Sequence, residues 1–396
     1  MKIDEIDVGS AKMVSVSEDL SREVYCVLGV PVDAVGMDAV LRRIQSAATS
    51  KIPFLISTPN LNFLVTSQLD RDFRETLVMS DLCTADGMPI VWIALLSGFP
   101  IKTRVAGSDI FDMLKAEHRR ADPLKIFFFG GAEGVAAAAS RVVNGRPGGI
   151  YCVGSLYPGF CSVEEMSRDE IINSINASGA DLLVVSLGAQ KGQLWLQRNH
   201  HRLTVPLRAH LGASINFEAG TVRRAPRILR KLGLEWLWRI KEEPHLWRRY
   251  WNDGRALALL LFTRLIPLLL WTRWLQLGAL RQAEDLTVIE IHNDGAVTLS
   301  LCGFANARNV EKAIAVFRRA IATSRQITLD FSKTRVIDAR FLGLLLMLKK
   351  NVRCLGSTVG FVGLSPCLQR IFRLNRLEFE EVDRDFMLVS GARRAA

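Results

Sequence analysis

Three short polar motifs in the first half of the chain carry side chains suited to handling a charged substrate. Thr58 and Asn60 stand in TPNLN, directly after an apolar run. Asp86 lies in ADGMP, where its carboxylate could act as a general base. Arg104 lies in TRVAGSDIF, and a guanidinium can bind a diphosphate. Plainer explanations stay open, since Asn and Thr cap helices, Asp-Gly forms turns, and an arginine can simply lie on the surface.

Two further motifs follow apolar runs of the same kind. Gly130 and Gly131 stand between KIFFF and a helical pattern, where free backbone N–H groups at a helix start can bind an anion. The glycines could instead allow close packing of helix on strand. The sequence LGAQKGQLW brings Gln190, Lys191 and Gln193 to the end of another apolar run. We expect these groups to contribute to substrate binding.

Charge and tryptophan concentrate between Ala219 and Arg281. This stretch has thirteen Lys or Arg against four Asp or Glu, and six of the eight tryptophans of the chain. Basic residues mixed with tryptophan suit an anionic membrane surface. Nucleic-acid binding would use the same mixture, but a long apolar run beside the tryptophans favours lipid. The arginines expected to stabilise a charged leaving group are Arg223, Arg224, Arg239, Arg248 and Arg249.

Metal chemistry is not expected. Asp70 and Asp72 form the acidic pair that many sugar transferases use, but they fall in a helical stretch, where residues two apart do not share a side. The seven cysteines include no Cys-x-x-Cys pair, which argues against a zinc site or a disulfide framework. We therefore expect neither a metal nor another cofactor.

Short apolar runs alternate with helical patterns from residue 24 to residue 218. PFLIST, KIFFFGG, DLLVVSLG and LRAHLGAS are typical of buried strands. Strands that alternate with helices predict an α/β fold with a mostly parallel, Rossmann-like sheet. Ligands bind beyond the carboxyl ends of such strands, which is where the polar motifs stand.

The remaining chain divides by composition. We predict a flexible arm at 1–23, a basic Trp-rich appendage at 219–255, a linker helix at 256–285 and a small mixed α/β domain at 286–391. Arg264, Pro267 and Arg273 interrupt the apolar run of the linker, so we expect it to lie in the membrane interface rather than to cross. Burial of this helix between two domains is the alternative.

The ordered motifs together resemble the WecG/TagA/CpsF family of bacterial glycosyltransferases over about residues 24–255. The shared set is TPN, ADG, R-x-x-G-x-D, GG, LGAxK and AG…RRAP…GLEW. The resemblance implies a metal-independent, inverting transfer with Asp86 as catalytic base, Thr58 and Arg104 in the catalytic site, and the appendage closing over it. The family commonly has Gln and Glu where this chain has Gly192 and Gln193, which puts donor specificity in doubt.

Residues 286–391 resemble a STAS domain, the fold of anti-sigma-factor antagonists, through DFSKTRVIDARFLGLLL and the order of elements. In that family a phosphorylatable Ser or Thr follows the aspartate. Ala339 and Arg340 follow Asp338 here, so we expect this domain to bind a protein partner or to dock on the catalytic domain without kinase control.

The resemblance implies a UDP-sugar-dependent hexosyltransferase of cell-surface polysaccharide synthesis. The donor would carry an N-acetylmannosamine-like or glucose-like sugar, and the acceptor would be linked to undecaprenyl diphosphate. The enzyme would be cytoplasmic and peripheral on the anionic inner face of the membrane, with no nucleic-acid partner. The alternatives are a non-catalytic regulatory scaffold that presents the STAS-like domain and, from charge alone, a nucleic-acid binder.

Overall fold

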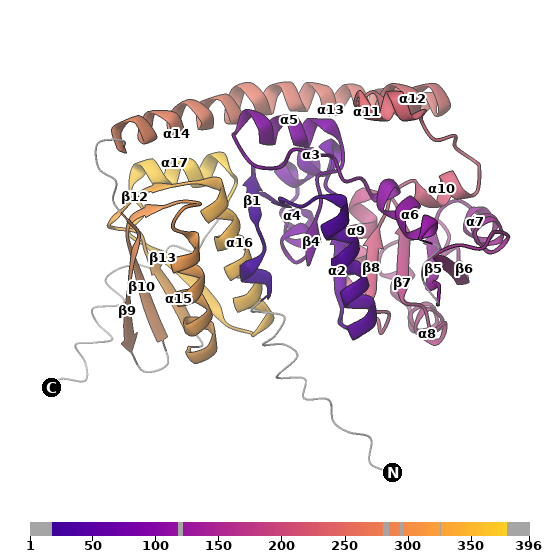
Figure 1. Ribbon diagram of the computed structural model, residues 1–396, viewed down its shortest axis with the longest axis horizontal. Coiled ribbons are helices and arrows are strands. Elements are labelled where there is room, and N and C mark those ends of the chain that lie inside the picture. Colours follow the sequence, from indigo (N-terminus) through magenta and orange to yellow (C-terminus); the bar gives the residue numbers. More distant parts are fainter. Residues whose placement is uncertain (1–17, 118–121, 280–284, 294–295, 325, 378–396) are drawn as a thin grey trace, which may run out of the picture. The chain divides into compact units, whose positions relative to one another are not determined.

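The computed structural model describes residues 18–117, 122–279, 285–293, 296–324 and 326–377 (Figure 1). It divides into two compact units. Val32–Leu259 form one, here called the large unit, and Met1–Pro31 with Leu260–Ala396 form the other, here called the small unit. The large unit thus begins at residue 32, whereas the sequence predicted a domain that starts at residue 24.

The large unit is built on a six-stranded sheet in the order β4-β3-β8-β7-β5-β6, in which every pairing is parallel. This confirms the predicted α/β fold with a parallel, Rossmann-like sheet. The four apolar runs chosen from the sequence are β3, β5, β7 and β8. The strands are β3 (Phe54–Ser57), β4 (Leu82–Cys83), β5 (Leu124–Gly130), β6 (Ile150–Leu156), β7 (Leu182–Ser186) and β8 (Leu207–His210).

Successive side chains of each central strand enter different cores, as the two-residue period of a strand requires. Phe128 of β5 packs in one core with helices α2, α6, α7 and α10, while Phe127 and Phe129 pack in the other with α8 and α9. Both faces of the sheet are therefore covered by helices. These helices are α2 (Met37–Ser50), α6 (Gly107–Ala116), α7 (Val135–Asn144), α8 (Asp169–Ala177), α9 (Ala189–Arg198) and α10 (Ser214–Glu218).

The other helices of the large unit follow the ends of β3 and β4 or belong to the basic appendage. The first group comprises α3 (Leu61–Leu69), α4 (Arg71–Val78) and α5 (Met88–Leu96). The second comprises α11 (Arg227–Lys231), α12 (Glu235–Glu242) and α13 (Trp247–Leu260). Helix α13 continues through a π-helical turn at Leu261–Leu265 into α14 (Ile266–Ala279).

The small unit contains a second, mixed sheet, as predicted for the C-terminal region. β10 pairs in parallel with β11 and β12 and antiparallel with β9, and β11 pairs in parallel with β13. The strands are β9 (Thr287–Asn293), β10 (Ala296–Ala305), β11 (Gln326–Asp330), β12 (Thr334–Ile337) and β13 (Thr358–Val362), and the helices are α15 (Val310–Thr323), α16 (Ala339–Cys354) and α17 (Pro366–Leu374). The extended segment predicted for LEFEEV lies almost wholly outside the described residues.

The first described residues are packed into the small unit. Residues 18–21 form a helical turn, and β1 (Val24–Val27) pairs with β2 (Val30–Asp33). Leu20 and Val24 are fully buried. Residues 18–23, which the sequence placed in a flexible arm at 1–23, are thus held in the small unit by the buried side chain of Leu20 and by the buried ion pair of Asp19 with Arg22.

Candidate functional site

Asp86 lies in a loop at the carboxyl ends of β3 and β4. Its backbone N–H donates to the Pro59 carbonyl at 2.9 Å, and the Val105 N–H donates to the Ala85 carbonyl at 2.9 Å. The next residue, Gly87, has φ +107°, a conformation that favours glycine, and it precedes the first turn of α5. Backbone bonds from two neighbouring segments thus fix this loop at the edge where parallel sheets bind ligands.

The Asp86 carboxylate faces the start of α6. Its Oδ2 accepts a hydrogen bond from the Gly107 N–H at 3.3 Å. Thr58 lies beside the same glycine, because a Cβ placed on Gly107 would be 3.3 Å from Thr58 Oγ1. The pKa of Asp86 is raised to about 7, chiefly by burial; Arg104 opposes this rise and Glu235 contributes to it. A carboxyl that titrates near neutrality suits a general base.

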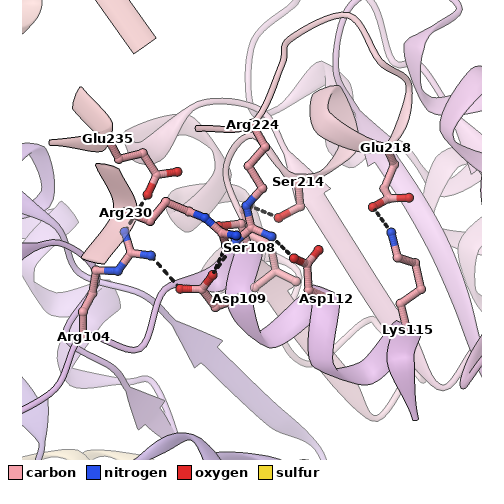
Figure 2. Close-up of polar contacts among 11 residues, drawn as sticks. Arg104, Ser108, Asp109, Asp112, Lys115, Ser214, Glu218, Arg224, Arg230 and Glu235 are labelled. Carbon is pink, nitrogen blue, oxygen red and sulfur yellow. Dashed lines mark hydrogen bonds and ion pairs between the residues drawn. The ribbon is translucent and has the colours of Figure 1, made fainter. Parts of the chain in front are cut away.

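Arg104 is held between two carboxylates (Figure 2). Its Nη2 donates to Asp109 Oδ2 and its Nη1 to Glu235 Oε2, each at 2.6 Å. Asp109 is on α6, whereas Glu235 opens α12 of the basic appendage, 131 residues further along the chain. The Arg104 side chain is 13% exposed. This residue therefore joins the Asp86 region to the appendage.

Asp109 is the centre of a larger ion-pair cluster. Besides Arg104 it binds Arg224 and, at 3.1 Å, Arg230, and both of these arginines come from the appendage segment (Figure 2). Arg224 also pairs with Asp112 and donates to Ser108 Oγ at 3.0 Å. The cluster balances three cations with three carboxylates and fastens the appendage to α6. Its members are Arg104, Arg224, Arg230, Asp109, Asp112 and Glu235.

Besides the ion pairs, packing contacts hold the appendage against α5 and Phe217. Gly233, with φ +74°, brings the turn before α12 onto α5, since a Cβ there would lie 3.0 Å from Met88 Cβ. Trp238 Nε1 donates to the Arg223 carbonyl at 2.9 Å. Arg239 pairs with Glu243 and lies over the Phe217 ring, 5.4 Å from its centroid.

Asp109, Arg230 and Glu235 were not named as site residues from the sequence. Asp109 stands in the R-x-x-G-x-D motif, and Glu235 in GLEW. Their place in shared motifs was the only signal that could have drawn attention to them. Nothing in the sequence indicated that they contact Arg104 and one another.

The other predicted binding residues have local structural partners. Asn60 caps α3, accepting from the Phe63 N–H at 3.2 Å, and its Cβ also borders Gly87. Gly130 allows β5 to approach β7, because a Cβ there would lie 2.5 Å from the Ser186 carbonyl oxygen, and the Gly131 N–H donates to that oxygen at 2.7 Å. The structure therefore gives Gly130 a packing role, while Gly131 has φ +81°, a conformation that favours glycine.

The LGAQKGQLW segment divides between surface and core. Gln190 donates to Asp70 Oδ2 at 2.6 Å, and Lys191 donates to the Cys161 carbonyl at 3.1 Å, both on the surface. Gln193 is fully buried, and its Oε1 accepts from Ser57 Oγ at 3.1 Å, one residue before Thr58. Gln193 thus binds the last residue of β3 from the protein interior.

His210 explains the glycine at position 192, a connection that the sequence did not reveal. A Cβ on Gly192 would overlap with His210 Cδ2 and lie 3.0 Å from Nε2. His210 is 3% exposed, and burial lowers its pKa to about 4, so the ring is neutral. Its Nε2 and the Gln193 Nε2 are buried without a hydrogen-bond partner among the described residues.

Arg248 and Arg249 lie apart from this cluster. Both are exposed on α13, and each guanidinium covers a neighbouring ring, that of Trp247 at 5.7 Å and that of Tyr250 at 5.0 Å. Arg223 is exposed as well. The structure therefore brings Asp86, Thr58, Arg104 and Arg224 into one region, borders it with Asn60, and leaves these three arginines at the surface.

Asp70 and Asp72 do not form a joint ligand set. Asp70 caps α4, accepting from the Phe73 N–H at 3.0 Å, and its other oxygen accepts from Gln190. Asp72 lies within the helix. Within the described ranges, no group of three or more His, Cys, Asp or Glu side chains could hold a metal ion.

Two curated relatives match part of the chain. One is an N-acetylglucosaminyldiphosphoundecaprenol N-acetyl-beta-D-mannosaminyltransferase of Bacillus spizizenii, 28% identical over 179 residues, which are 45% of this chain and 66% of the relative. The other carries the same name in Bacillus subtilis, with 26% identity over 205 residues, 50% of this chain and 75% of the relative. The chain thus spans just under two thirds of the first relative.

A solved structure, the anti-sigma factor antagonist SpoIIAA in its unphosphorylated form, matches 28% of this chain and 99% of its own length, with 17% identity and a TM-score of 0.24. The family model of the glycosyl transferase WecG/TagA/CpsF family matches residues 25–268, more than half of the chain. The chain therefore belongs to the WecG/TagA/CpsF family of glycosyl transferases.

Proposed function

We propose that this protein transfers a sugar from a UDP-sugar to a sugar carried on undecaprenyl diphosphate, with inversion at the anomeric carbon. The relatives from the two Bacillus species are named for transfer of N-acetylmannosamine to an undecaprenyl-diphosphate-linked N-acetylglucosamine. An N-acetylmannosamine-like donor and this type of acceptor are the first candidates here. The product would enter cell-surface polysaccharide synthesis.

The position and pKa of Asp86 carry this proposal. A carboxyl with a pKa of about 7 is close to half ionised at neutral pH, so it can accept the proton of the acceptor hydroxyl. In an inverting displacement the hydroxyl oxygen attacks the anomeric carbon, the bond to the UDP oxygen breaks, and the hydroxyl proton passes to Asp86. Thr58 lies close enough to the same loop to orient a substrate hydroxyl.

Arg104 is the candidate contact for the donor diphosphate. Both of its terminal nitrogens are already bonded to carboxylates, and Glu235 belongs to the appendage. We propose that the diphosphate replaces Glu235 at Nη1, because a phosphate oxygen offers the same acceptor geometry with more negative charge. Arg224 and Arg230 would remain on Asp109 and keep α6 in place.

We propose that the helical stretch Pro244–Leu275 attaches the enzyme to the membrane surface. Its 32 residues are long and apolar enough to cross a membrane by length and composition, and the apolar part is mostly unburied. Exposed apolar side chains recur along it every three or four residues, apart from one position taken by Arg255. They are Trp247, Trp251, Leu259, Phe262, Ile266, Leu270 and Trp274.

A spacing of three to four residues places neighbouring side chains on one side of a helix, as an interfacial helix requires. A crossing would place Arg264 and Arg273 in hydrocarbon, at about 2.5–3.5 kcal/mol each near the centre of a span. We therefore favour peripheral attachment at the cytoplasmic face.

Vesicle co-flotation tests the attachment to an anionic surface. Arg248→Glu with Arg249→Glu should weaken binding to anionic vesicles, and unchanged flotation would contradict this account.

The catalytic assignment is tested by Asp86→Asn. We expect turnover, measured as acceptor-dependent UDP release, to fall by about two orders of magnitude or more while UDP-sugar binding stays nearly intact. Asp169→Asn is the matched control, because this side chain is 85% exposed on α8 and pairs only with Arg202 among the contacts described. Turnover of Asp86→Asn within threefold of the parent would refute the assignment.

The non-catalytic scaffold makes a different prediction. If Gly192 and Gln193 mark a degenerate site, the parent itself would release no UDP with any acceptor, whether or not UDP-sugars protect it from unfolding. The intact Asp86 loop and the paired Arg104 favour the enzyme.

A further inference from the structure

One face of α16 is covered by residues near the start of the chain. Val24–Val27, which form β1, are all buried in the small unit. A Cβ placed on Gly343 of α16 would overlap with the Val24 carbonyl oxygen and lie 2.6 Å from the carbonyl carbon. Glycine in a helix interior is less favourable than alanine. Gly343 therefore has a packing reason: it is the residue that lets β1 lie against the helix backbone.

Buried charges extend the same contact. Lys350 of α16 pairs with Asp19 at 2.7 Å, and Asp19 also pairs with Arg22 at 2.8 Å. All three side chains are 5–6% exposed. At the other end of the contact, Arg340 Nη1 donates to the Val24 carbonyl at 3.4 Å. Removing one partner of a buried ion pair leaves the other charge uncompensated. An apolar strand without these charges would therefore be a poorer ligand for this face of α16 than the chain's own segment.

The covering segment runs directly into the large unit. After the turn at Leu28 and Gly29, β2 begins in the small unit and ends at Asp33 in the large unit. Asp33 is 1% exposed, and its Oδ2 accepts a hydrogen bond from the Cys83 N–H at 2.8 Å. Cys83 ends β4, three residues before Asp86. The buried carboxylate of Asp33 thus anchors the strand that leads into the Asp86 loop.

We propose that α16 is a docking face for the chain's own residues 19–27, and that its occupancy positions the Asp86 loop through Asp33 and Cys83. The ligand that fits this face is a short extended strand preceded by an acidic side chain. Only the catalytic consequence of positioning the Asp86 loop rests on the proposed function.

Gly343→Ala in the full chain tests docking, because the two explanations predict opposite changes in the unfolding midpoint. Helix propensity alone would raise the unfolding midpoint, whereas the overlap with β1 should lower it. Gly254→Ala is the matched control, because this helical glycine has nothing within 4 Å of an added Cβ and its replacement should raise the midpoint. We also expect amides of residues 24–27 and of Cys83 to exchange hydrogen at least tenfold faster in Gly343→Ala.

Asp19→Asn provides a second, milder variant, because it keeps the shape of the side chain and removes the charge that Lys350 and Arg22 share. We expect the same faster exchange at residues 24–27 and at Cys83. Unchanged exchange in both variants, with a raised midpoint for Gly343→Ala, would overturn the docking face. Faster exchange at 24–27 with an unchanged Cys83 would overturn the link to the Asp86 loop. Failure of the proposed function would appear separately, as a parent protein without transfer activity.

Discussion

Replacing Asp86 by Asn should make the protein more stable at alkaline pH. In the folded chain burial raises the pKa of Asp86 from 3.8 to about 7. Between these two values the unfolded chain has released a proton that the folded chain still holds. The free energy of unfolding therefore falls as pH rises from about 4 to 7, and the loss is complete above pH 7.

The size of the effect follows from the shift. A rise of about three pH units corresponds to about 4 kcal/mol at roughly 1.4 kcal/mol per unit. The Asp86 side chain keeps some contact with solvent, which offsets part of the cost of burying its charge. We therefore expect the free energy of unfolding of Asp86→Asn to exceed that of the parent by about 2 kcal/mol at pH 8. At pH 4 the two should differ by close to nothing, because both side chains are neutral in the folded chain.

Urea unfolding of the parent and of Asp86→Asn at pH 4 and pH 8 measures this difference. Asp169→Asn should show no comparable gain at either pH, because its carboxylate is exposed. The reasoning would be refuted if Asp86→Asn were less stable than the parent at pH 8, or if its advantage were the same at both pH values.

Three more predictions follow from the site. Turnover should rise with pH through about 7, and Glu235→Gln should move this rise to lower pH because it removes a negative charge that raises the pKa of Asp86; a shift to higher pH would contradict it. Gly192→Ala should lower the free energy of unfolding by about 1–2 kcal/mol in urea, since overlap with His210 outweighs better helix propensity. The same substitution made in a His210→Gly background should cost less, and a Gly192→Ala variant more stable than the parent would refute the overlap. Activity should survive excess chelator, because arginines can neutralise the diphosphate; loss of activity that Mg²⁺ restores would exclude a metal-free mechanism.

The regular elements were predictable because each depends on a local pattern. The apolar runs of β3, β5, β7 and β8 are long enough to indicate buried strands, and Ser365 and Pro366 mark the start of α17. β4 has only two residues and was not identified. Its pairing with β3 depends on a partner distant in the sequence.

The candidate site was predictable only in part. Thr58 and Asp86 could be singled out as candidates because they follow β3 and β4, and Arg104 because it stands in the R-x-x-G-x-D motif. The partners of Arg104 were not, because Glu235 is 131 residues away and no local pattern links the two. For the same reason the sequence did not show that Gly192 accommodates His210 or that residues 19–27 pack on α16.

The most direct test of the central claim is the structure of the reaction product. The protein would be incubated with UDP-N-acetylmannosamine and an undecaprenyl-diphosphate-linked N-acetylglucosamine, and the glycolipid analysed by mass spectrometry and by NMR of the new anomeric centre. We predict one added sugar with inverted configuration, formed by the parent and by Asp169→Asn but not by Asp86→Asn. A product that retains the anomeric configuration, or an equal yield from Asp86→Asn, would contradict direct displacement with Asp86 as the base.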